Sequence, residues 1–146
     1  MTAPAPAPLD RFLPAQERDY AIALQELKDG RKRSHWIWYV LPQLRALGRS
    51  PRAREYGIAD RAEAAAYIAH PVLGPRLVEC VQAVLTHPER SAVDMLGEVD
   101  ALKFRSCLTL FAEVAPDEPC FRRALAVFYD NEPDRETLRL MASPAR

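Results

Sequence analysis

Apolar residues recur at helical spacing along most of the chain. The first such stretch runs from Pro14, which suits a first helical turn, to Gly30, which suits a helix end. Its apolar positions follow the i, i+3, i+4, i+7 spacing of one helical face: Tyr20, Ala23, Leu24 and Leu27. The same spacing predicts six further helices, at about 60–69, 73–85, 91–96, 100–114, 118–129 and 133–141.

Two of these helices carry a start signal in the sequence. Asp60 followed by Glu63 has the spacing of a capping box, and Ser91 with Asp94 repeats it. Gly97 is a natural end for the second of them. These local signals predict helix boundaries independently of the apolar spacing.

The run Trp36 to Leu41 is apolar throughout, so its spacing fits a buried helix and a buried strand equally. Ser34 as an N-cap and Pro42 as a terminator favour a helix. Beyond it we expect a loop as far as Ile58, with one short helical turn at most.

Together these elements predict an all-α protein. No stretch shows the clean two-residue alternation of a strand, and the sequence has no internal repeat. A length of 146 residues with 49% hydrophobic residues suits one domain. We expect a single compact domain of six to eight helices with irregular crossings over residues 10–143, and a disordered Ala/Pro tail over residues 1–9.

Composition narrows the class of protein. Lys+Arg and Asp+Glu are both 20, so no overall cationic field favours nucleic acid. The three cysteines form no CxxC pair, which argues against a disulfide framework and a cysteine-based zinc site. The N-terminus lacks the features of a secretory signal, and no apolar run is long enough to cross a membrane. We expect a cytoplasmic protein with no metal, no cofactor and no membrane association.

The segment 34–39, Ser-His-Trp-Ile-Trp-Tyr, is the first candidate for chemistry. It holds both tryptophans of the chain, Trp36 and Trp38, together with His35. Aromatic rings with a polar edge suit stacking on a flat ligand, and histidine titrates near neutral pH. The alternative is that the aromatic rings are core residues on one face of a buried helix, which is the commoner role of such a pattern.

The helix around residues 100–114 is the second candidate. Asp100 and Lys103 fall within or beside its apolar face, and Ser106 is on the same helix. One interpretation makes Asp100 the N-cap, with Lys103 extending to solvent beside it. The other points a partly buried Lys103 at a phosphate or carboxylate.

Other polar residues carry weaker signals. Glu63 is a helix cap in one interpretation and a general acid in the other, and the sequence contains no familiar catalytic motif. Seven cations lie within 24 residues around the tryptophans: Arg31, Lys32, Arg33, Arg45, Arg49, Arg52 and Arg54. They are either a basic rim for nucleic acid or ordinary solvated loop residues.

These residues resemble a family of unknown function, DUF1810, whose members are sometimes labelled "calpastatin". The shared pieces lie between Phe12 and about Leu140 and include segment 34–39 with Pro42-Gln43, Leu47-Gly48, His70-Pro71, Arg76-Leu77 and Lys103 with Ser106. The resemblance implies an all-helical fold and supplies no activity. A calpastatin-type inhibitor is disordered, whereas this sequence has the apolar spacing of core-forming helices over nearly its whole length. Lys103-Phe104 is also similar to an element of NADAR-type ADP-ribose hydrolases, whose acidic and Trp-Gly signature has no counterpart after it.

Three functions follow as hypotheses. In the first, a pocket near segment 34–39 binds or hydrolyses a nucleotide-like compound, such as an ADP-ribose or other N-glycoside. Its catalytic candidates are Glu63, Asp100 and His35, and its ligand-binding candidates are Trp36, Trp38, Arg76, Lys103 and Ser106. The alternative is a non-enzymatic protein-interaction module whose partner the sequence does not name. The third is nucleic-acid binding through the basic rim.

Overall fold

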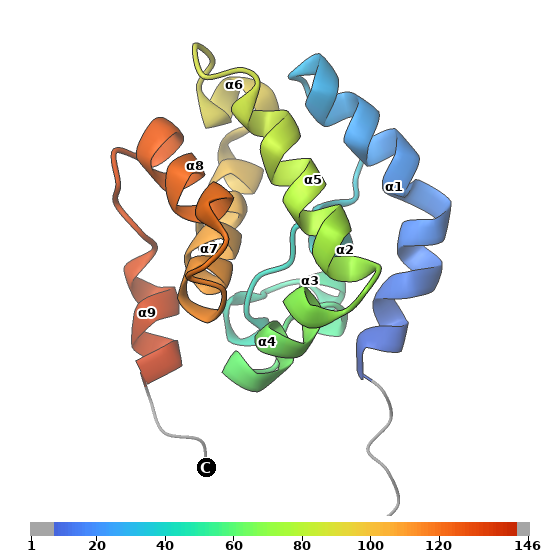
Figure 1. Ribbon diagram of the computed structural model, residues 1–146. Helices are drawn as coiled ribbons and strands as arrows, with labels where there is room; N and C mark the ends of the chain where they lie inside the picture. The colour runs from blue at the N-terminus through green and yellow to red at the C-terminus, as the bar shows by residue number, and fades with distance from the viewer. Residues whose placement is uncertain (1–7, 143–146) are drawn as a thin grey trace, which may run out of the picture.

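The computed structural model describes residues 8–142, and the secondary-structure elements within this range are helices joined by loops (Figure 1). Two 3-10 helices, η1 and η2, accompany the α-helices. The elements are η1 Pro8–Arg11, α1 Phe12–Asp29, α2 Ile37–Val40, η2 Arg45–Leu47, α3 Pro51–Glu55, α4 Arg61–Ala69, α5 Leu73–Leu85, α6 Ala92–Leu96, α7 Glu98–Val114, α8 Pro119–Tyr129 and α9 Arg135–Ala142.

The long helices enclose one hydrophobic core. Helix α5 packs against α1, α4 and α8, and α7 packs against α4, α6, α8 and α9. Aromatic rings pack between these helices. The ring centres of Phe12 and Tyr67 lie 5.0 Å apart, edge to face, and those of Tyr67 and Phe111 lie 5.4 Å apart. Helix α2 lies behind α5 in Figure 1, and its side chains Ile37, Tyr39 and Val40 belong to the core.

The predicted all-α single domain is confirmed. Residues 8–142 contain nine α-helices, one more than expected, because Pro51–Glu55 forms the short helix α3. The predicted caps form: the Asp60 carboxylate accepts from the Glu63 N–H at 2.9 Å, and the Ser91 hydroxyl accepts from the Asp94 N–H at 3.0 Å. Gly30 ends α1 with φ 74°, a conformation that glycine adopts without strain.

Two predicted caps are wrong. Trp36, not Ser34, precedes α2, and the Ser34 hydroxyl instead donates to the Glu26 carboxylate at 2.6 Å. Helix α7 begins at Glu98, so Asp100 lies in its first turn rather than at its N-cap. The Ser34 side chain is held by the buried Glu26 instead, and the Asp100 side chain is held by Lys32, which is distant in the sequence.

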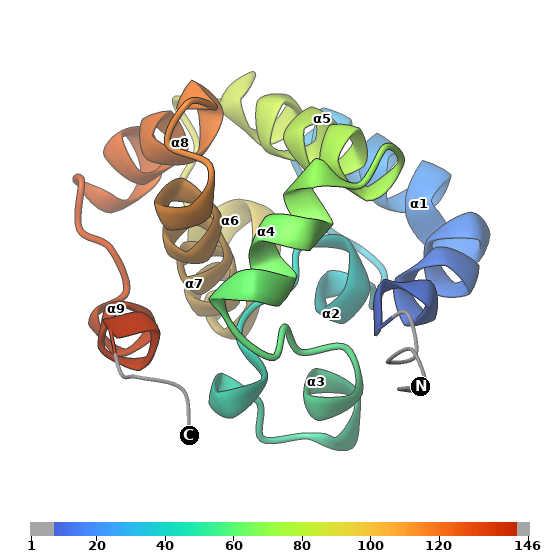
Figure 2. The same ribbon diagram turned by 60° about the horizontal axis from the view of Figure 1, so that its bottom comes forward.

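Residues 43–58 form a lobe closed at its neck by a parallel bridge between Leu44 and Ile58. The Arg45 N–H donates to the Ile58 carbonyl at 2.8 Å, and the Ile58 N–H donates to the Gln43 carbonyl at 2.9 Å. A Cβ at Gly57 would lie 2.3 Å from Arg45 Cα, so only glycine fits this close approach. The lobe, which carries η2 and α3, lies across from α7 and α9 in Figure 2.

The expected Ala/Pro tail, residues 1–9, falls outside the described residues except for Pro8 and Leu9, which begin η1. Within residues 8–142, no helix combines the length and the apolar character needed to cross a bilayer.

Candidate functional site

A cavity of about 410 Å³ separates the 43–58 lobe from α7 and the start of α9. The lobe supplies both apolar and polar side chains to the cavity wall, and α7 supplies Val99, Leu102, Lys103 and Ser106. The complete lining is Gln43, Leu47, Arg49, Ser50, Ala53, Val99, Leu102, Lys103, Ser106, Asp134 and Glu136. Its size and its mainly apolar wall with a few polar groups are typical of small-molecule sites.

Lys103 is the central cation of this cavity, and its side chain is 24% exposed. Its Nζ lies 3.9 Å from Asp100 Oδ1, at the long end for an ion pair, and 5.7 Å from the centre of the Trp38 ring. Arg52 Cζ lies 5.3 Å from the same ring centre. Trp38 therefore has two cations within cation–π range, one from the lobe and one from α7.

Asp100 is shared between two lysines. Lys32 Nζ lies 2.8 Å from Asp100 Oδ2, and this lysine side chain is only 7% exposed. Lys32 also lies over the Trp36 ring, at 4.9 Å from its centre. One carboxylate thus serves two ammonium groups, and Lys103 is the less tightly held of the two lysines.

The acidic residues of the cavity have partners of their own. The Asp134 carboxylate accepts from the Thr137 N–H at 2.9 Å and from the Thr137 hydroxyl at 2.6 Å. Glu136 pairs with Arg139 on the same helix. Arg49, in contrast, makes no hydrogen bond or ion pair within residues 8–142. The charges that remain available to a ligand are therefore cationic.

Trp38 also lines a small recess that adjoins the cavity. The recess has a volume of about 10 Å³ and shares Gln43, Ala53 and Lys103 with the cavity lining. Trp38 Nε1 is buried and has no hydrogen-bond partner among the described residues. The recess that adjoins the cavity is thus lined by a side chain whose indole N–H is unpaired.

Glu26 of α1 holds segment 34–39 in place. Its carboxylate is buried and accepts from the Arg33 N–H at 2.8 Å, the Ser34 N–H at 3.0 Å, the Ser34 hydroxyl at 2.6 Å and Trp36 Nε1 at 2.9 Å. Burial raises the pKa of Glu26, but these hydrogen bonds outweigh it and bring the pKa to about 2. Glu26 is therefore ionised and fixes the segment from which Trp38 extends.

The structure brings four predicted site residues together: Lys103 and Ser106 line the cavity, Trp38 lines the recess, and Asp100 pairs with Lys103. The Ser106 hydroxyl donates to the Leu102 carbonyl at 3.2 Å, which leaves its oxygen free to accept. These residues come from α2 and α7, two elements that are far apart in the sequence.

Two predicted residues, Trp36 and His35, lie outside the cavity lining. Trp36 is 1% exposed, so its ring offers no open face to a ligand. His35 is exposed, and its carbonyl accepts from the Tyr39 hydroxyl at 3.4 Å. Neither residue lines the cavity or the recess.

Glu63 also lies away from the cavity, buried on α4. Two of its contacts are with Arg11, at 2.9 and 3.1 Å, and a third is with the Ala59 N–H at 2.8 Å. Burial raises the pKa of Glu63, whereas the hydrogen bonds from Arg11 and Ala59 lower it, and the net pKa is below its ordinary value. Glu63 thus connects α4 to the start of the chain.

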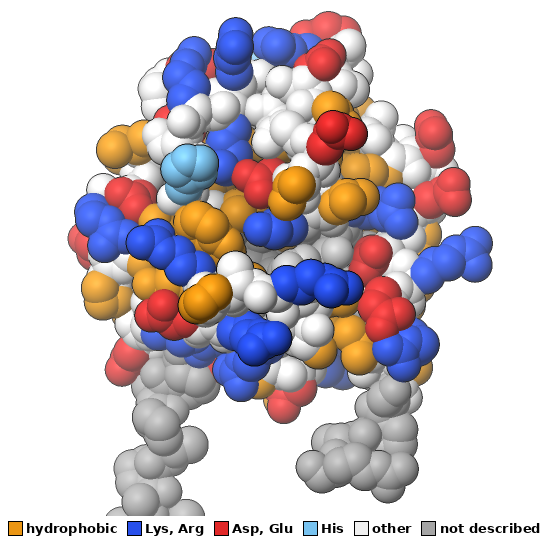
Figure 3. Space-filling view, turned by 180° about the vertical axis from the view of Figure 1, so that it is seen from behind, with side chains coloured by type: hydrophobic (Ala, Val, Ile, Leu, Met, Phe, Trp, Pro, Cys, Tyr) orange, Lys and Arg blue, Asp and Glu red, His pale blue; other side chains and the backbone are white. Residues whose placement is uncertain are grey.

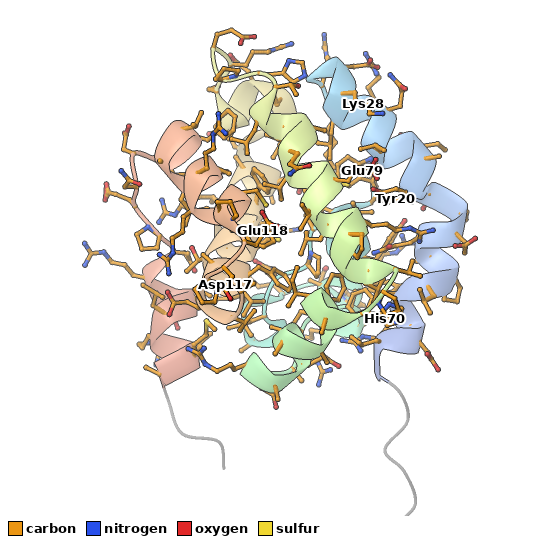
Figure 4. The ribbon with its side chains drawn as sticks, viewed as in Figure 1. Tyr20, Lys28, His70, Glu79, Asp117 and Glu118 are labelled. Atoms are coloured by element: carbon orange, nitrogen blue, oxygen red, sulfur yellow. The ribbon has the colours of Figure 1, made fainter. Side chains whose placement is uncertain are left out.

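Arg76 lines a different and more open depression of about 610 Å³, together with Glu79 and Glu118. Its guanidinium stacks on the Tyr20 ring at 4.8 Å and pairs with Glu17 at 3.0 Å. The Tyr20 hydroxyl donates to Glu79 at 2.5 Å, and Figure 4 shows these two side chains together between α1 and α5. Arg76 is thus separated from Lys103.

The lobe residues Gln43, Arg49 and Ser50 are part of the cavity, although sequence reasoning did not select them as ligand-binding residues. They lie in a loop without apolar periodicity, so no spacing pattern indicates their direction. The signal that could have found Gln43 is its place in the family motif directly after segment 34–39 and Pro42.

The seven cations of the expected basic rim do not form one group, although Arg49 and Arg54 line a shared depression with Glu136. Lys32 is buried against Asp100, Arg33 pairs with Asp29 at 3.1 Å, and Arg52 lies over Trp38. The face seen from behind in Figure 3 carries cationic side chains interspersed with acidic and hydrophobic ones.

Comparison with known proteins places the chain in a family. The model of the family described as "Protein of unknown function (DUF1810)" matches residues 6–141. A solved structure, that of the conserved hypothetical protein Rv1873 from Mycobacterium tuberculosis, is similar at 45% sequence identity with a TM-score of 0.91. The match covers 93% of this chain and 97% of that one, and no curated protein matches. The chain belongs to the DUF1810 family.

Proposed function

We propose that this member of the DUF1810 family binds a small organic anion of the nucleotide class in the cavity between the 43–58 lobe and α7. The observation that carries the proposal is Lys103, a partly buried cation on the cavity wall whose only carboxylate partner within residues 8–142 is shared with Lys32. A point charge in a partly desolvated site attracts a phosphate or carboxylate more strongly than an exposed one.

The rest of the cavity suits the organic part of such a ligand. Leu47, Val99 and Leu102 supply an apolar wall, while Gln43, Ser50 and Ser106 supply polar atoms at separate points. A few convergent polar groups on an apolar surface fix the orientation of a ligand that has both kinds of surface. Nucleotides and ADP-ribose compounds combine a flat organic group with phosphate.

The proposal is a binding function rather than hydrolysis. Of the three catalytic candidates, only Asp100 lies beside the cavity, and its carboxylate holds two lysines. Glu63 is engaged with Arg11, and His35 lies outside the lining. A carboxylate that is neutralised in this way is a poor stabiliser of an oxocarbenium-like transition state.

A thermal-shift screen with ADP-ribose, AMP and adenosine tests the proposal. A ligand at 100 times its dissociation constant stabilises the folded protein by about 2.7 kcal/mol. We expect stabilisation by AMP or ADP-ribose that Lys103→Met abolishes, each variant being compared with its own unliganded melting temperature. The matched control is Lys28→Met, because Lys28 is exposed on α1 and its side chain makes no hydrogen bond or ion pair within residues 8–142. Equal stabilisation of both variants contradicts the proposal.

A protein-interaction role is a second candidate, favoured by the exposure of Val99 and Leu102, at 66% and 65%. Exposed apolar side chains that are neighbours on a helix mark many docking surfaces. One substitution distinguishes small-molecule binding from a protein-interaction role. Leu102→Ser reduces ligand-induced stabilisation if the side chain contacts a small molecule, and leaves it unchanged if Leu102 serves a protein partner.

A further inference from the structure

The two tryptophans of the chain have opposite environments at their indole nitrogens. Trp36 Nε1 donates to the Glu26 carboxylate at 2.9 Å. Trp38 Nε1 is also buried, but no described residue accepts from it. An indole N–H only donates, so its missing partner must be an acceptor. Buried donors are rarely left unpaired, because each one has lost its hydrogen bond to water.

The space next to Trp38 is limited in size. The recess of about 10 Å³ is close to the smallest volume that holds one water-sized oxygen. Its lining is Ile37, Trp38, Leu41, Gln43, Ala53, Gly57 and Lys103. A whole ligand does not fit there, whereas one oxygen atom of a ligand in the adjoining cavity does.

The polar groups around the recess are mainly donors. Lys103 Nζ is an ammonium with three N–H groups and a single long contact to Asp100, at 3.9 Å. The Gln43 side-chain amide makes no hydrogen bond within residues 8–142 and offers both a donor and an acceptor. Arg52 adds positive charge near the Trp38 ring, with its Cζ 5.3 Å from the ring centre.

From this convergence we propose that the recess is an oxyanion subsite. One negatively charged oxygen of the ligand accepts hydrogen bonds from Trp38 Nε1 and Lys103 Nζ, and the organic part extends into the cavity towards Leu102. The subsite rests on the proposed ligand cavity and adds to it a ligand class and an orientation. The ligand carries a phosphate or carboxylate at its inner end.

The charge of the surroundings favours an anion over a neutral acceptor. Lys103 shares the Asp100 carboxylate with the closer Lys32, and Arg52 lies 5.3 Å from the centre of the Trp38 ring, so two cations lie near the recess. An anionic oxygen balances this charge and satisfies the indole N–H at the same time. Hydrogen bonds to a charged acceptor are also the stronger kind.

Two-dimensional ¹H–¹⁵N NMR of the indole groups tests the subsite. The protein has two tryptophans and therefore two indole signals, which Trp38→Phe assigns. We expect AMP or ADP-ribose to move the Trp38 indole proton downfield, as a new hydrogen bond does, while the Trp36 signal stays. Adenosine, which lacks the phosphate, leaves both signals in place. Inorganic phosphate and acetate, added separately, distinguish a phosphate subsite from a carboxylate subsite.

The outcomes separate the subsite from the cavity. If backbone amides of α7 shift with AMP but the Trp38 indole signal does not, the subsite is wrong and the cavity stands. If neither set of signals shifts with any of the five compounds, both proposals fail. A Trp38 shift that Lys103→Met removes supports both.

A binding measurement adds a second criterion. Trp38→Phe keeps an aromatic ring beside the two cations and removes the pyrrole ring with its N–H. We expect it to weaken AMP binding by about tenfold or more, the value of one hydrogen bond to a charged acceptor, without changing adenosine binding. Unchanged AMP affinity in this variant overturns the subsite.

Discussion

Replacing Glu26 with glutamine removes a buried negative charge from the junction between α1 and segment 34–39. The carboxylate accepts four hydrogen bonds there, from Arg33, Ser34 and Trp36. Glutamine has the same shape, but its NH₂ group faces donors instead of accepting from them. We therefore expect Glu26→Gln to fold with lower stability and a displaced aromatic segment.

The size of the effect follows from the pKa of Glu26. Hydrogen bonds outweigh burial and lower this pKa from its ordinary 4.5 to about 2, and each pKa unit corresponds to 1.36 kcal/mol. The charged form thus contributes ~3 kcal/mol to the free energy of unfolding. Because the folded-state pKa is the lower one, this contribution is fully present above pH 4.5 and is lost as the pH falls towards 2.

Urea unfolding at several pH values between 2 and 7 measures this contribution. We expect Glu26→Gln to lower the free energy of unfolding by ~3 kcal/mol at pH 7, and we expect the difference from the wild type to shrink below pH 4.5. The control is Glu89→Gln, the same chemical change at an exposed residue without a partner in residues 8–142. A loss that is independent of pH, or equal in the two variants, refutes the role of the Glu26 charge.

Two further predictions concern the lobe and the core. Gly57→Ala places a Cβ 2.3 Å from Arg45 Cα, so we expect a loss of about 1–3 kcal/mol in thermal unfolding together with weaker ligand binding; an unchanged melting temperature contradicts the close approach. Burial raises the pKa of the thiols of Cys80 and Cys120 to about 12 and that of Cys107 well above its ordinary value. A disulfide reagent at pH 8 should therefore label none of the three rapidly until the protein unfolds, and fast labelling of the folded protein contradicts their burial.

The helices were predictable because their signals are local. Asp60 with Glu63 and Ser91 with Asp94 lie within one helical turn, so the chain itself supplies each cap and its partner. Ser34 and Asp100 show the limit of this reasoning. Ser34 is held by Glu26, and Asp100 is held by Lys32, 68 positions earlier in the chain. Apolar spacing does not indicate such contacts.

Part of the candidate site could also be predicted from local spacing. Lys103 and Ser106 share one face of α7, so helical spacing alone places them together. Periodicity shows which face of a helix is buried but not which helix packs against it. Arg76 and Glu63 therefore looked like partners of Lys103, although their own neighbours are Tyr20 and Arg11.

A crystal structure of the protein with AMP tests the central claim most directly. We expect the phosphate within hydrogen-bond distance of both Lys103 Nζ and Trp38 Nε1, with the organic part between Leu102 and the 43–58 lobe. A nucleotide bound elsewhere on the protein, or bound in the cavity with its phosphate turned out to solvent, would contradict it.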